Sequence, residues 1–480
     1  MSLSKQIANN VLWKYLELVS VSGIQLLSTF IMAPLLTPED YGIIAMVIVF
    51  STLANVLIDS GFGQAIIREK DVTRLDYSTI LYFNVVVSLL IYAILYFSTG
   101  LIANFYSDPK LNEICKVTFL VLPLNALSLV QITKMQKELR FKRLCIVSFL
   151  ASILSSIVAI YLAYRYRNVW ALVIQNLLTY FLRMLFLWIT TDFIPLLSFS
   201  ISSLKKYFIF SKNILFSSII GVFFNNIYSL LIGSVYSTAD LGFYNQAERI
   251  KNLGSQTTTQ VIQSVTYPVL AKINNETGDI KNGYKKIISI TLLFVGFIMA
   301  LLMGCSMDLF EIIMGGSPIW RVSGLYFLLI GINGILYPLH CVNQNILMVK
   351  GDSKTVLLLE IMRRSIMIII LLVTVNFDIK IFVFGLTFYS VLLLFLNLYY
   401  CGRPINYSLA EQLKDVSPIL LRLMMMVAAS LLVGWMSSDT PTIVSLLLSL
   451  MTGLISGIIL FCKQPAFQLV LNMLKSYINK

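Results

Sequence analysis

The sequence predicts an all-α membrane protein that crosses the bilayer about fourteen times. Of its 480 residues, 58% are hydrophobic and only 12% are charged, and the mean hydropathy is +0.83. A soluble protein carries about 25% charged residues. Because roughly 20 consecutive apolar residues span a bilayer as a helix, the chain has room for about fourteen such segments. The connections between them are short, so no soluble domain is expected.

The predicted spans follow one another with short polar connections. The polar N-terminus and the length of the first apolar run differ from a cleavable signal peptide, so the first span is expected to remain in the membrane. In chain order the spans are residues 12–36, 41–61, 77–105, 114–133, 144–164, 168–190, 207–235, 250–271, 284–307, 320–348, 355–376, 379–401, 418–437 and 442–462.

Lysine and arginine alternate between the two sides of this arrangement. The connections on the N-terminal side hold 24 of them, whereas the opposite connections hold seven: Lys110, Arg165, Arg167, Arg249, Lys251, Arg321 and Lys380. Cytoplasmic loops carry the excess, so both termini are predicted to be cytoplasmic. The net charge of +13 is spread over loops and therefore does not indicate a nucleic-acid partner.

A short motif recurs 200 residues apart, as Asp40-Tyr41-Gly42 and Asp240-Leu241-Gly242. Six predicted spans separate the two copies, so both run the same way through the membrane. The sequence therefore predicts a parallel repeat of two six-helix lobes around a central cavity, with the site where the lobes meet. The predicted divisions are an N-lobe at 1–200, a C-lobe at 201–402 and a C-terminal helix pair at 403–480.

The stretch 238–273 is unusually polar for so apolar a chain. Its polar residues recur at helical spacing, which places them on one face of a helix: Asn252, Gln256, Thr259, Gln260 and Gln263. A polar stripe within the membrane must face protein or a water-filled cavity. We therefore expect this stripe to form one wall of the cavity. The repeat further predicts that Asn55 and Asp59 face Ser255 and Thr259.

Several charges fall within or beside predicted spans. Glu360 and Arg364 lie four residues apart and are expected to pair, which turns Arg363 about 100° away and leaves it as a candidate for an anionic ligand. Arg183 is equally open to a structural bond or a ligand. At the start of the polar stretch, Glu248 and Lys251 are expected to pair, and Arg249 points elsewhere; Lys14 and Glu17 can pair in the same way. Asp59 and Glu360 are weak candidates for ion coupling.

Residue sets for chemistry are missing from the sequence. The six cysteines are scattered without metal-ligand spacing, and the single histidine, His340, cannot build a multi-histidine site; it is expected to be a hydrogen-bonded core residue. No phosphate-binding loop, dinucleotide motif or nucleophile–base set is found. We therefore predict no catalytic residues, no metal and no cofactor, and a protein that is not an enzyme.

Four segments carry a family resemblance: LGFYNQAERI, VTYPVLAKI, LLTPEDYGIIAMV and IDSGFGQAIIR. In these the chain resembles Wzx-type polysaccharide flippases, in the colanic and teichuronic acid exporter branch of the multidrug/oligosaccharidyl-lipid/polysaccharide transporter superfamily. The resemblance implies a flippase in the bacterial inner membrane for undecaprenyl-pyrophosphate-linked oligosaccharides, working by alternating access in surface polysaccharide biosynthesis. Membrane lipids and polysaccharide polymerase or chain-length machinery are the implied partners.

The resemblance also implies roles for the candidate residues. Arg183, Arg249, Arg363 and Arg364 become candidate contacts of the pyrophosphate, and the stripe of Asn252, Gln256, Gln260 and Gln263 a candidate sugar face. The alternative is a cation-coupled multidrug antiporter of the same superfamily, which would favour acidic residues deep in a lobe. A membrane glycosyltransferase, polymerase or ligase is a third class, for which the loops are too short.

Overall fold

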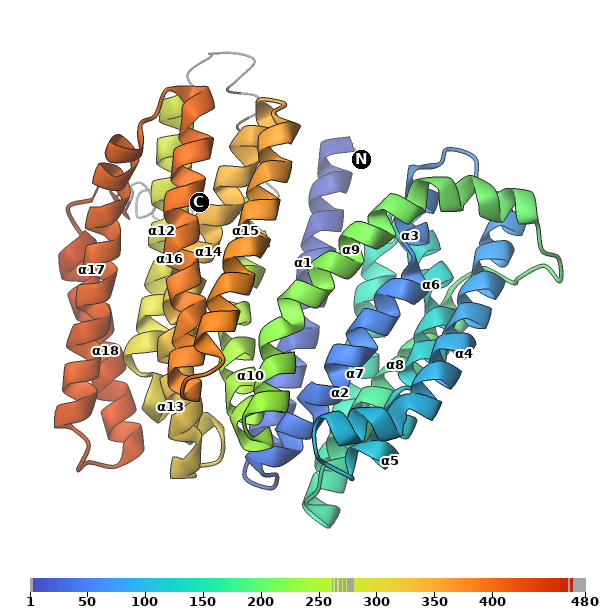
Figure 1. Ribbon diagram of the computed structural model, residues 1–480, viewed down its shortest axis with the longest axis horizontal. Helices are drawn as coiled ribbons and strands as arrows, with labels where there is room; N and C mark the ends of the chain where they lie inside the picture. The colour runs from blue at the N-terminus through green and yellow to red at the C-terminus, as the bar shows by residue number, and fades with distance from the viewer. Residues whose placement is uncertain are drawn as a thin grey trace. The chain divides into compact units, whose positions relative to one another are not determined.

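The computed structural model describes residues 3–260, 262–263, 266, 270, 273, 280–464 and 467–468. In this part of the chain all regular secondary structure is helical (Figure 1). Two compact units divide between Gly242 and Phe243. They are described separately below as unit 1 and unit 2.

Unit 1 contains nine helices and the start of a tenth among its described residues. They are α1 (Leu3–Met32), α2 (Pro38–Asp59), α3 (Phe62–Arg68), α4 (Arg74–Phe105), α5 (Leu111–Thr118), α6 (Val121–Lys137), α7 (Phe141–Tyr166), α8 (Trp170–Thr190), α9 (Ile201–Val235) and the first turn of α10 (Thr238–Asn252). Helix α7 packs between α1 and α8, and α6 packs against α4 and α8.

Unit 2 continues from α10 through a π-helical turn, η1 (Leu253–Thr257), toward the C-terminal helices. Its further described elements are α12 (Ile280–Gly304), α13 (Ser306–Ile313), the 3₁₀ turn η2 (Pro318–Trp320), α14 (Arg321–Val349), α15 (Ser353–Thr374), α16 (Ile379–Gly402), the 3₁₀ turn η3 (Arg403–Ile405), α17 (Leu409–Met436) and α18 (Thr442–Phe461). Helix α14 packs against α12 and α16, and α17 packs against α12 and α18.

Twelve helices among the described residues are long and apolar enough to cross a membrane, which confirms the prediction of an all-α polytopic protein. Two of the fourteen predicted spans are not among the twelve. The span 355–376 forms α15, a regular 22-residue helix, but Glu360, Arg363 and Arg364 interrupt its apolar run. The span 250–271 begins in α10 and η1, and much of the rest lies outside the described residues.

One predicted span is composite. The span 114–133 consists of two helices, α5 and α6, with a break at Phe119 and Leu120. The end of α2 is followed directly by α3, because Ser60 and Gly61 take left-handed φ angles of 48° and 73° and turn the chain. Periodicity alone does not reveal the break between α5 and α6, since apolar residues continue through it, whereas the predicted span 41–61 ends at the turn between α2 and α3.

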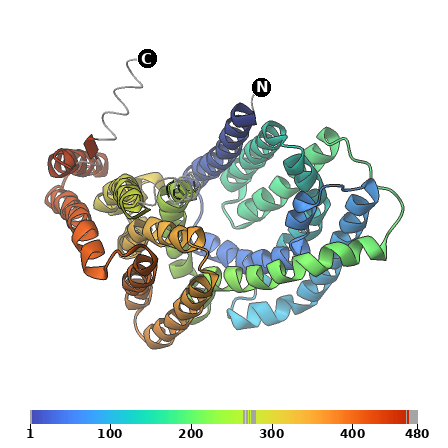
Figure 2. The same ribbon diagram turned by 90° about the horizontal axis from the view of Figure 1, so that it is seen from above.

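Helix α9 belongs to unit 1. It packs against α2, α3 and α4, and both views show it running beside α2 (Figures 1 and 2). The compact units therefore divide after α9, at Gly242, whereas the repeat predicts a lobe boundary at residue 200. The lobe boundaries are defined by the sequence repeat and the units by packing, so the lobe boundaries stay a prediction.

The repeated motif marks two equivalent helix starts. Thr37 caps α2, with its hydroxyl accepting from the amide of Asp40 while the Asp40 carboxylate accepts from the amide of Thr37 at 2.9 Å. Ser237 caps α10 in the same manner, since its hydroxyl accepts from the amide of Asp240 at 3.0 Å and donates to the Asp240 carboxylate at 2.6 Å. Asp40 completes a capping box at the start of α2, and Asp240 takes the same position at the start of α10, bonded to the hydroxyl of its capping residue.

Gly42 and Gly242 recur for a second reason, which is close backbone approach. A Cβ atom on Gly42 would lie 1.9 Å from the carbonyl oxygen of Thr238, and one on Gly242 would lie 2.0 Å from the carbonyl oxygen of Pro38. All four residues lie in unit 1, and Pro38 and Thr238 are themselves 200 residues apart. The first turns of α2 and α10 thus touch reciprocally, and only glycine fits at the contact.

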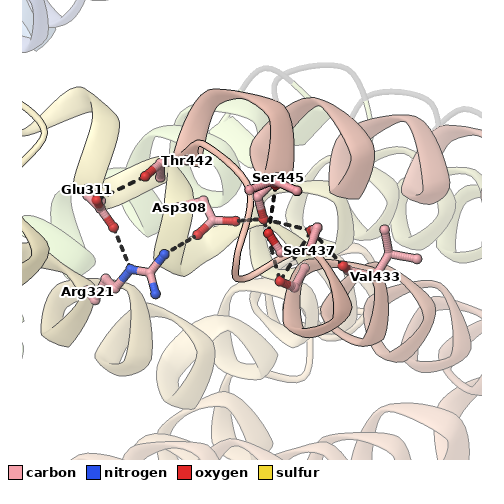
Figure 3. Close-up of polar contacts among 9 residues, drawn as sticks. Asp308, Glu311, Arg321, Val433, Ser437, Thr442 and Ser445 are labelled. Carbon is pink, nitrogen blue, oxygen red and sulfur yellow. Dashed lines mark hydrogen bonds and ion pairs between the residues drawn. The ribbon is translucent and has the colours of Figure 1, made fainter.

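An ionic network within unit 2 connects α18 to α13 and α14 (Figure 3). The Arg321 guanidinium donates to Asp308 at 2.8 Å and to Glu311 at 2.5 Å. The carboxylates also accept from α18, Asp308 from the Ser445 hydroxyl at 2.6 Å and Glu311 from the Thr442 hydroxyl at 3.1 Å. Both carboxylates are largely buried. Through these bonds the network joins the start of α14, α13 and the start of α18.

Candidate functional site

The charge cluster predicted in the span 355–376 lies on α15. Glu360 accepts from Arg364 at 2.7 Å, as the four-residue spacing predicts. The expectation that Arg363 is left without a partner is wrong, because its guanidinium lies 3.6 Å from the other carboxylate oxygen of Glu360. The long arginine side chain reaches across the 100° between the two faces. One carboxylate therefore holds two guanidinium groups, and the cluster keeps a net charge of +1.

Neighbouring helices complete this cluster. Arg363 donates to the side-chain oxygen of Asn397 on α16 at 2.7 Å. The Asn397 amide nitrogen in turn lies 2.8 Å from Nδ1 of His340 on α14, so the prediction that His340 is hydrogen-bonded is confirmed. The Arg363 side chain is only 14% exposed. Three helices of unit 2 thus hold one guanidinium in a fixed position.

A second cationic cluster lies in unit 1, around Glu17 of α1. The Glu17 carboxylate pairs with Lys14 at 2.9 Å, which confirms that local pair, and accepts from the Ser148 hydroxyl of α7 at 2.8 Å. Arg183 of α8 approaches the same carboxylate at 3.9 Å, with its side chain 30% exposed. Two cations, Lys14 and Arg183, thus share one carboxylate. The cluster has a net charge of +1 and attracts a further anion.

The predicted polar stripe is split between two faces. Thr259 and Ser255 are fully buried; the Ser255 hydroxyl donates to the carbonyl of Gly334, and Thr259 donates to the carbonyl of Ser255. Gln260 is exposed and Gln256, Gln263 and Asn252 are partly buried. The physical reason is that Thr259 and Gln260 are successive residues, about 100° apart around a helix, so the packing that buries Thr259 leaves Gln260 exposed.

The expectation that Asn55 and Asp59 face Ser255 and Thr259 concerns both units and stays a prediction; the contacts inside each unit are as follows. Asn55 accepts from Asn125 of α6 at 2.8 Å, inside unit 1. Asp59 lies at the turn between α2 and α3 and accepts from the backbone of Gly63. Ser255 and Thr259 are fully buried and bonded within unit 2.

The first helical turns of the polar stretch carry the remaining predicted charges. Glu248 and Lys251 lie 3.4 Å apart, which confirms their pairing. Arg249 lies beside them on α10 and is partly buried. Arg249 thus lies near the end of α10, before the π-helical turn that carries Gln256.

Unit 1 also contains a basic pocket of about 300 Å³, which sequence reasoning did not single out. Its lining includes Arg68, Lys70 and Lys206, together with Glu69 and Tyr207. Lys206 pairs with Glu69 at 3.4 Å, so the pocket keeps a net positive charge. The residues come from the end of α3 and from α9, which are distant in sequence.

The predicted absence of a metal site was based on residue spacing. Across the residues that the structure describes, no group of three His, Cys, Asp or Glu side chains could hold a metal ion.

Two partners of the candidate residues are not predicted from the sequence: Asn125, which bonds Asn55, and Asn397, which bonds Arg363. Each is an isolated asparagine in an apolar span, and such a residue in a membrane helix is itself a signal, because it must find a partner there.

The chain is similar to proteins of known role and structure. The family profile described as "Polysaccharide biosynthesis protein" matches residues 31–321. The teichuronic acid biosynthesis protein TuaB of Bacillus subtilis (strain 168) is 24% identical over 357 residues, 73% of each chain. The lipopolysaccharide biosynthesis protein WzxC of Escherichia coli (strain K12) is 23% identical over 306 residues, 60% of this chain and 59% of WzxC.

Solved structures show the same fold at low identity. The lipid II flippase MurJ in an inward closed conformation aligns with a TM-score of 0.70 and 14% identity, over 94% of this chain and 99% of that one. An inward-facing multidrug resistance transporter of the MATE family aligns with a TM-score of 0.53 and 16% identity, over 83% and 94%. Because the profile covers more than half of the sequence, the chain belongs to the family of polysaccharide biosynthesis proteins and has the fold of this group of membrane transporters.

Proposed function

We propose that this protein is a flippase for undecaprenyl-pyrophosphate-linked oligosaccharides in the bacterial inner membrane, with both termini in the cytoplasm. It moves repeat units to the outer leaflet by alternating access, for surface polysaccharide synthesis, and performs no covalent chemistry. The family membership and the likeness to TuaB and WzxC support this role. Polysaccharide polymerase or chain-length machinery would use the delivered units.

The observation that carries the proposal is the guanidinium pair on α15. Arg363 and Arg364 share a single carboxylate, Glu360, so the cluster attracts an anion. Arginine is suited to pyrophosphate because its planar donors bind phosphate oxygens in pairs. A charged helix of this kind is unfavourable against lipid by about 2.5–3.5 kcal/mol for each arginine near the bilayer centre, which favours a functional reason for it.

Other candidate contacts are assigned within the same proposal. Arg183 and Arg249 are proposed as further head-group contacts. The partly exposed side chains of Gln256, Gln260 and Gln263, with Asn252, are proposed as the sugar face, since amides hydrogen-bond hydroxyl groups as donor and acceptor. The multidrug antiporter is disfavoured because Glu360, one of its two candidate ion-coupling acids, is already bound to two arginines; Asp59 is the other.

The test replaces Arg363 in the full chain. Arg363→Ala is expected to abolish surface polysaccharide and to accumulate lipid-linked repeat units, while the protein is still found in the membrane at normal amounts. Arg165→Ala is the matched control, because Arg165 is an exposed arginine at the end of α7. Normal surface polysaccharide in the Arg363 variant would contradict the proposal, as would equal loss in both variants.

A further inference from the structure

His340 is the only histidine of the chain, and its surroundings define its protonation. It lies on α14 and contacts Asn397 of α16, which in turn accepts a hydrogen bond from Arg363 of α15. An isolated ionisable side chain within a membrane segment needs a partner or a function. The hydrogen bonds around His340 allow its role to be worked out atom by atom.

The first step fixes the orientation of Asn397. An arginine guanidinium can only donate hydrogen bonds, and Arg363 lies 2.7 Å from the side-chain oxygen of Asn397. The oxygen of the amide is therefore turned to Arg363. The amide nitrogen, which can only donate, is turned to His340.

The second step fixes the tautomer of His340. Its Nδ1 lies 2.8 Å from the donating nitrogen of Asn397, so Nδ1 must be the acceptor and carries no proton. The neutral ring then bears its proton on Nε2. A second proton on Nδ1 would break the bond to Asn397 and place a cation beside Arg363.

The third step concerns the donors that are left over. His340 Nε2 and Arg363 Nε are both buried atoms, and neither has a hydrogen-bond partner among the described residues. Both are donors, so they call for an acceptor and exclude a cation. Leaving a buried donor without a partner costs about 1–3 kcal/mol, and more for a charged group. Two such donors in one contact chain indicate a site prepared for an oxygen-bearing ligand.

We infer that His340 is a positioning residue that holds Arg363 through Asn397, and that its Nε2–H donates to a pyrophosphate oxygen of the transported lipid. The inference rests on the proposed function, because it assigns a ligand to the same arginine cluster. It adds a neutral donor to the charged ones. A hydrogen bond is directional, so a neutral donor selects a ligand that places an oxygen at one position. A cation alone attracts any anion.

The first measurement uses the wild-type full chain in lipid nanodiscs, purified without a histidine tag and labelled with ¹⁵N-histidine. Because there is one histidine, each nitrogen signal is assigned without variants. We expect the neutral Nε2–H tautomer, and an Nε2–H signal that moves when undecaprenyl pyrophosphate is added and stays in place with undecaprenol, which lacks the anion. An Nδ1–H tautomer or a doubly protonated ring would overturn the positioning role.

The second measurement compares variants for binding of undecaprenyl pyrophosphate. His340→Leu is expected to weaken binding about ten- to a hundredfold, the loss of one hydrogen bond to a charged group. His340→Gln, which keeps one acceptor and one donor, is expected to restore most of the affinity. Wild-type affinity in His340→Leu, or an Nε2 signal unmoved by a probe that binds, would refute the ligand role.

The outcomes separate this inference from the proposed function. If the probe binds and Arg363→Ala abolishes export, but neither the signal nor the His340→Leu affinity responds, the inference fails alone. If the wild-type chain does not bind the probe and Arg363→Ala exports normally, the proposed function fails and the ligand role with it. The tautomer decides the positioning of Arg363 in either case.

Discussion

Replacing Arg321 is predicted to weaken the attachment of α18 to α13 and α14. Its guanidinium bonds two carboxylates, Asp308 and Glu311, whose side chains are 10% and 9% exposed. Arg321→Ala leaves these two like charges buried, close together and without their cation. Removing one partner of a buried ion pair costs about 3–5 kcal/mol. Because the Arg321 side chain is 41% exposed, water can reach part of the gap, so we expect a loss of about 3 kcal/mol.

The loss should be visible as a lower melting temperature. For a unit of this size 1 kcal/mol corresponds to about 2–4 °C, so Arg321→Ala should melt roughly 6–12 °C below the wild type. The assay is thermal unfolding in detergent of a protein whose other five cysteines are replaced by serine, followed by the reaction of a fluorogenic maleimide with Cys305, which is buried at the start of α13. Exposure of this thiol reports the opening of the same region.

Two variants control the interpretation. Arg321→Lys keeps the charge but not the planar pair of donors, and should recover part of the loss. Adding Asp308→Asn to Arg321→Ala removes one of the two stranded carboxylates and should raise the melting temperature again. An Arg321→Ala protein that melts with the wild type would refute the reasoning, because it would mean that the two carboxylates do not need their cation.

Two shorter predictions concern unit 1. Gly242→Ala should destabilise the folded protein by about 1–3 kcal/mol, because its Cβ would lie 2.0 Å from the carbonyl of Pro38. Gly221→Ala in α9, where a Cβ would meet no atom within 4 Å, should stabilise it by up to ~1 kcal/mol. Equal shifts of the melting temperature in the two variants would contradict this. The hydrogen bond from Arg140 lowers the pKa of Asp192, so the pair contributes stability above the unfolded pKa of about 3.9 and loses it as pH falls through the lower folded value. The melting difference between wild type and Asp192→Asn should therefore disappear in acid, and a difference independent of pH would refute it.

Local sequence spacing predicted the local contacts. Glu248–Lys251 and Glu360–Arg364 are three and four residues apart, and both pairs form, because a helix brings such residues to one side. The recurrence of the Asp–x–Gly motif likewise corresponds to two equivalent capped helix starts. In both cases the backbone geometry of one helix decides the contact.

The contacts that sequence spacing did not predict are tertiary. Arg363 donates to Asn397, 34 residues away, and Arg183 approaches Glu17. The position of each arginine within a predicted span indicates a candidate residue but not its partner. Which helices neighbour one another is not contained in the periodicity of any one of them. The split of the polar stripe has the same cause, since the packing of this stretch against α14 decides which of its polar residues are buried.

The reciprocal contact of Gly42 and Gly242 has the form of an interface between two copies of one protein. In a two-fold symmetric dimer, residue i of one subunit meets residue j of the other, and j meets i in return. Here Gly42 meets Thr238 while Gly242 meets Pro38, which is that relation with the second copy renumbered by 200. Fusion of two copies of a gene would preserve such a contact inside a single chain. The two glycines are then thermodynamically coupled, because a displacement caused by a side chain at one of them makes room at the other.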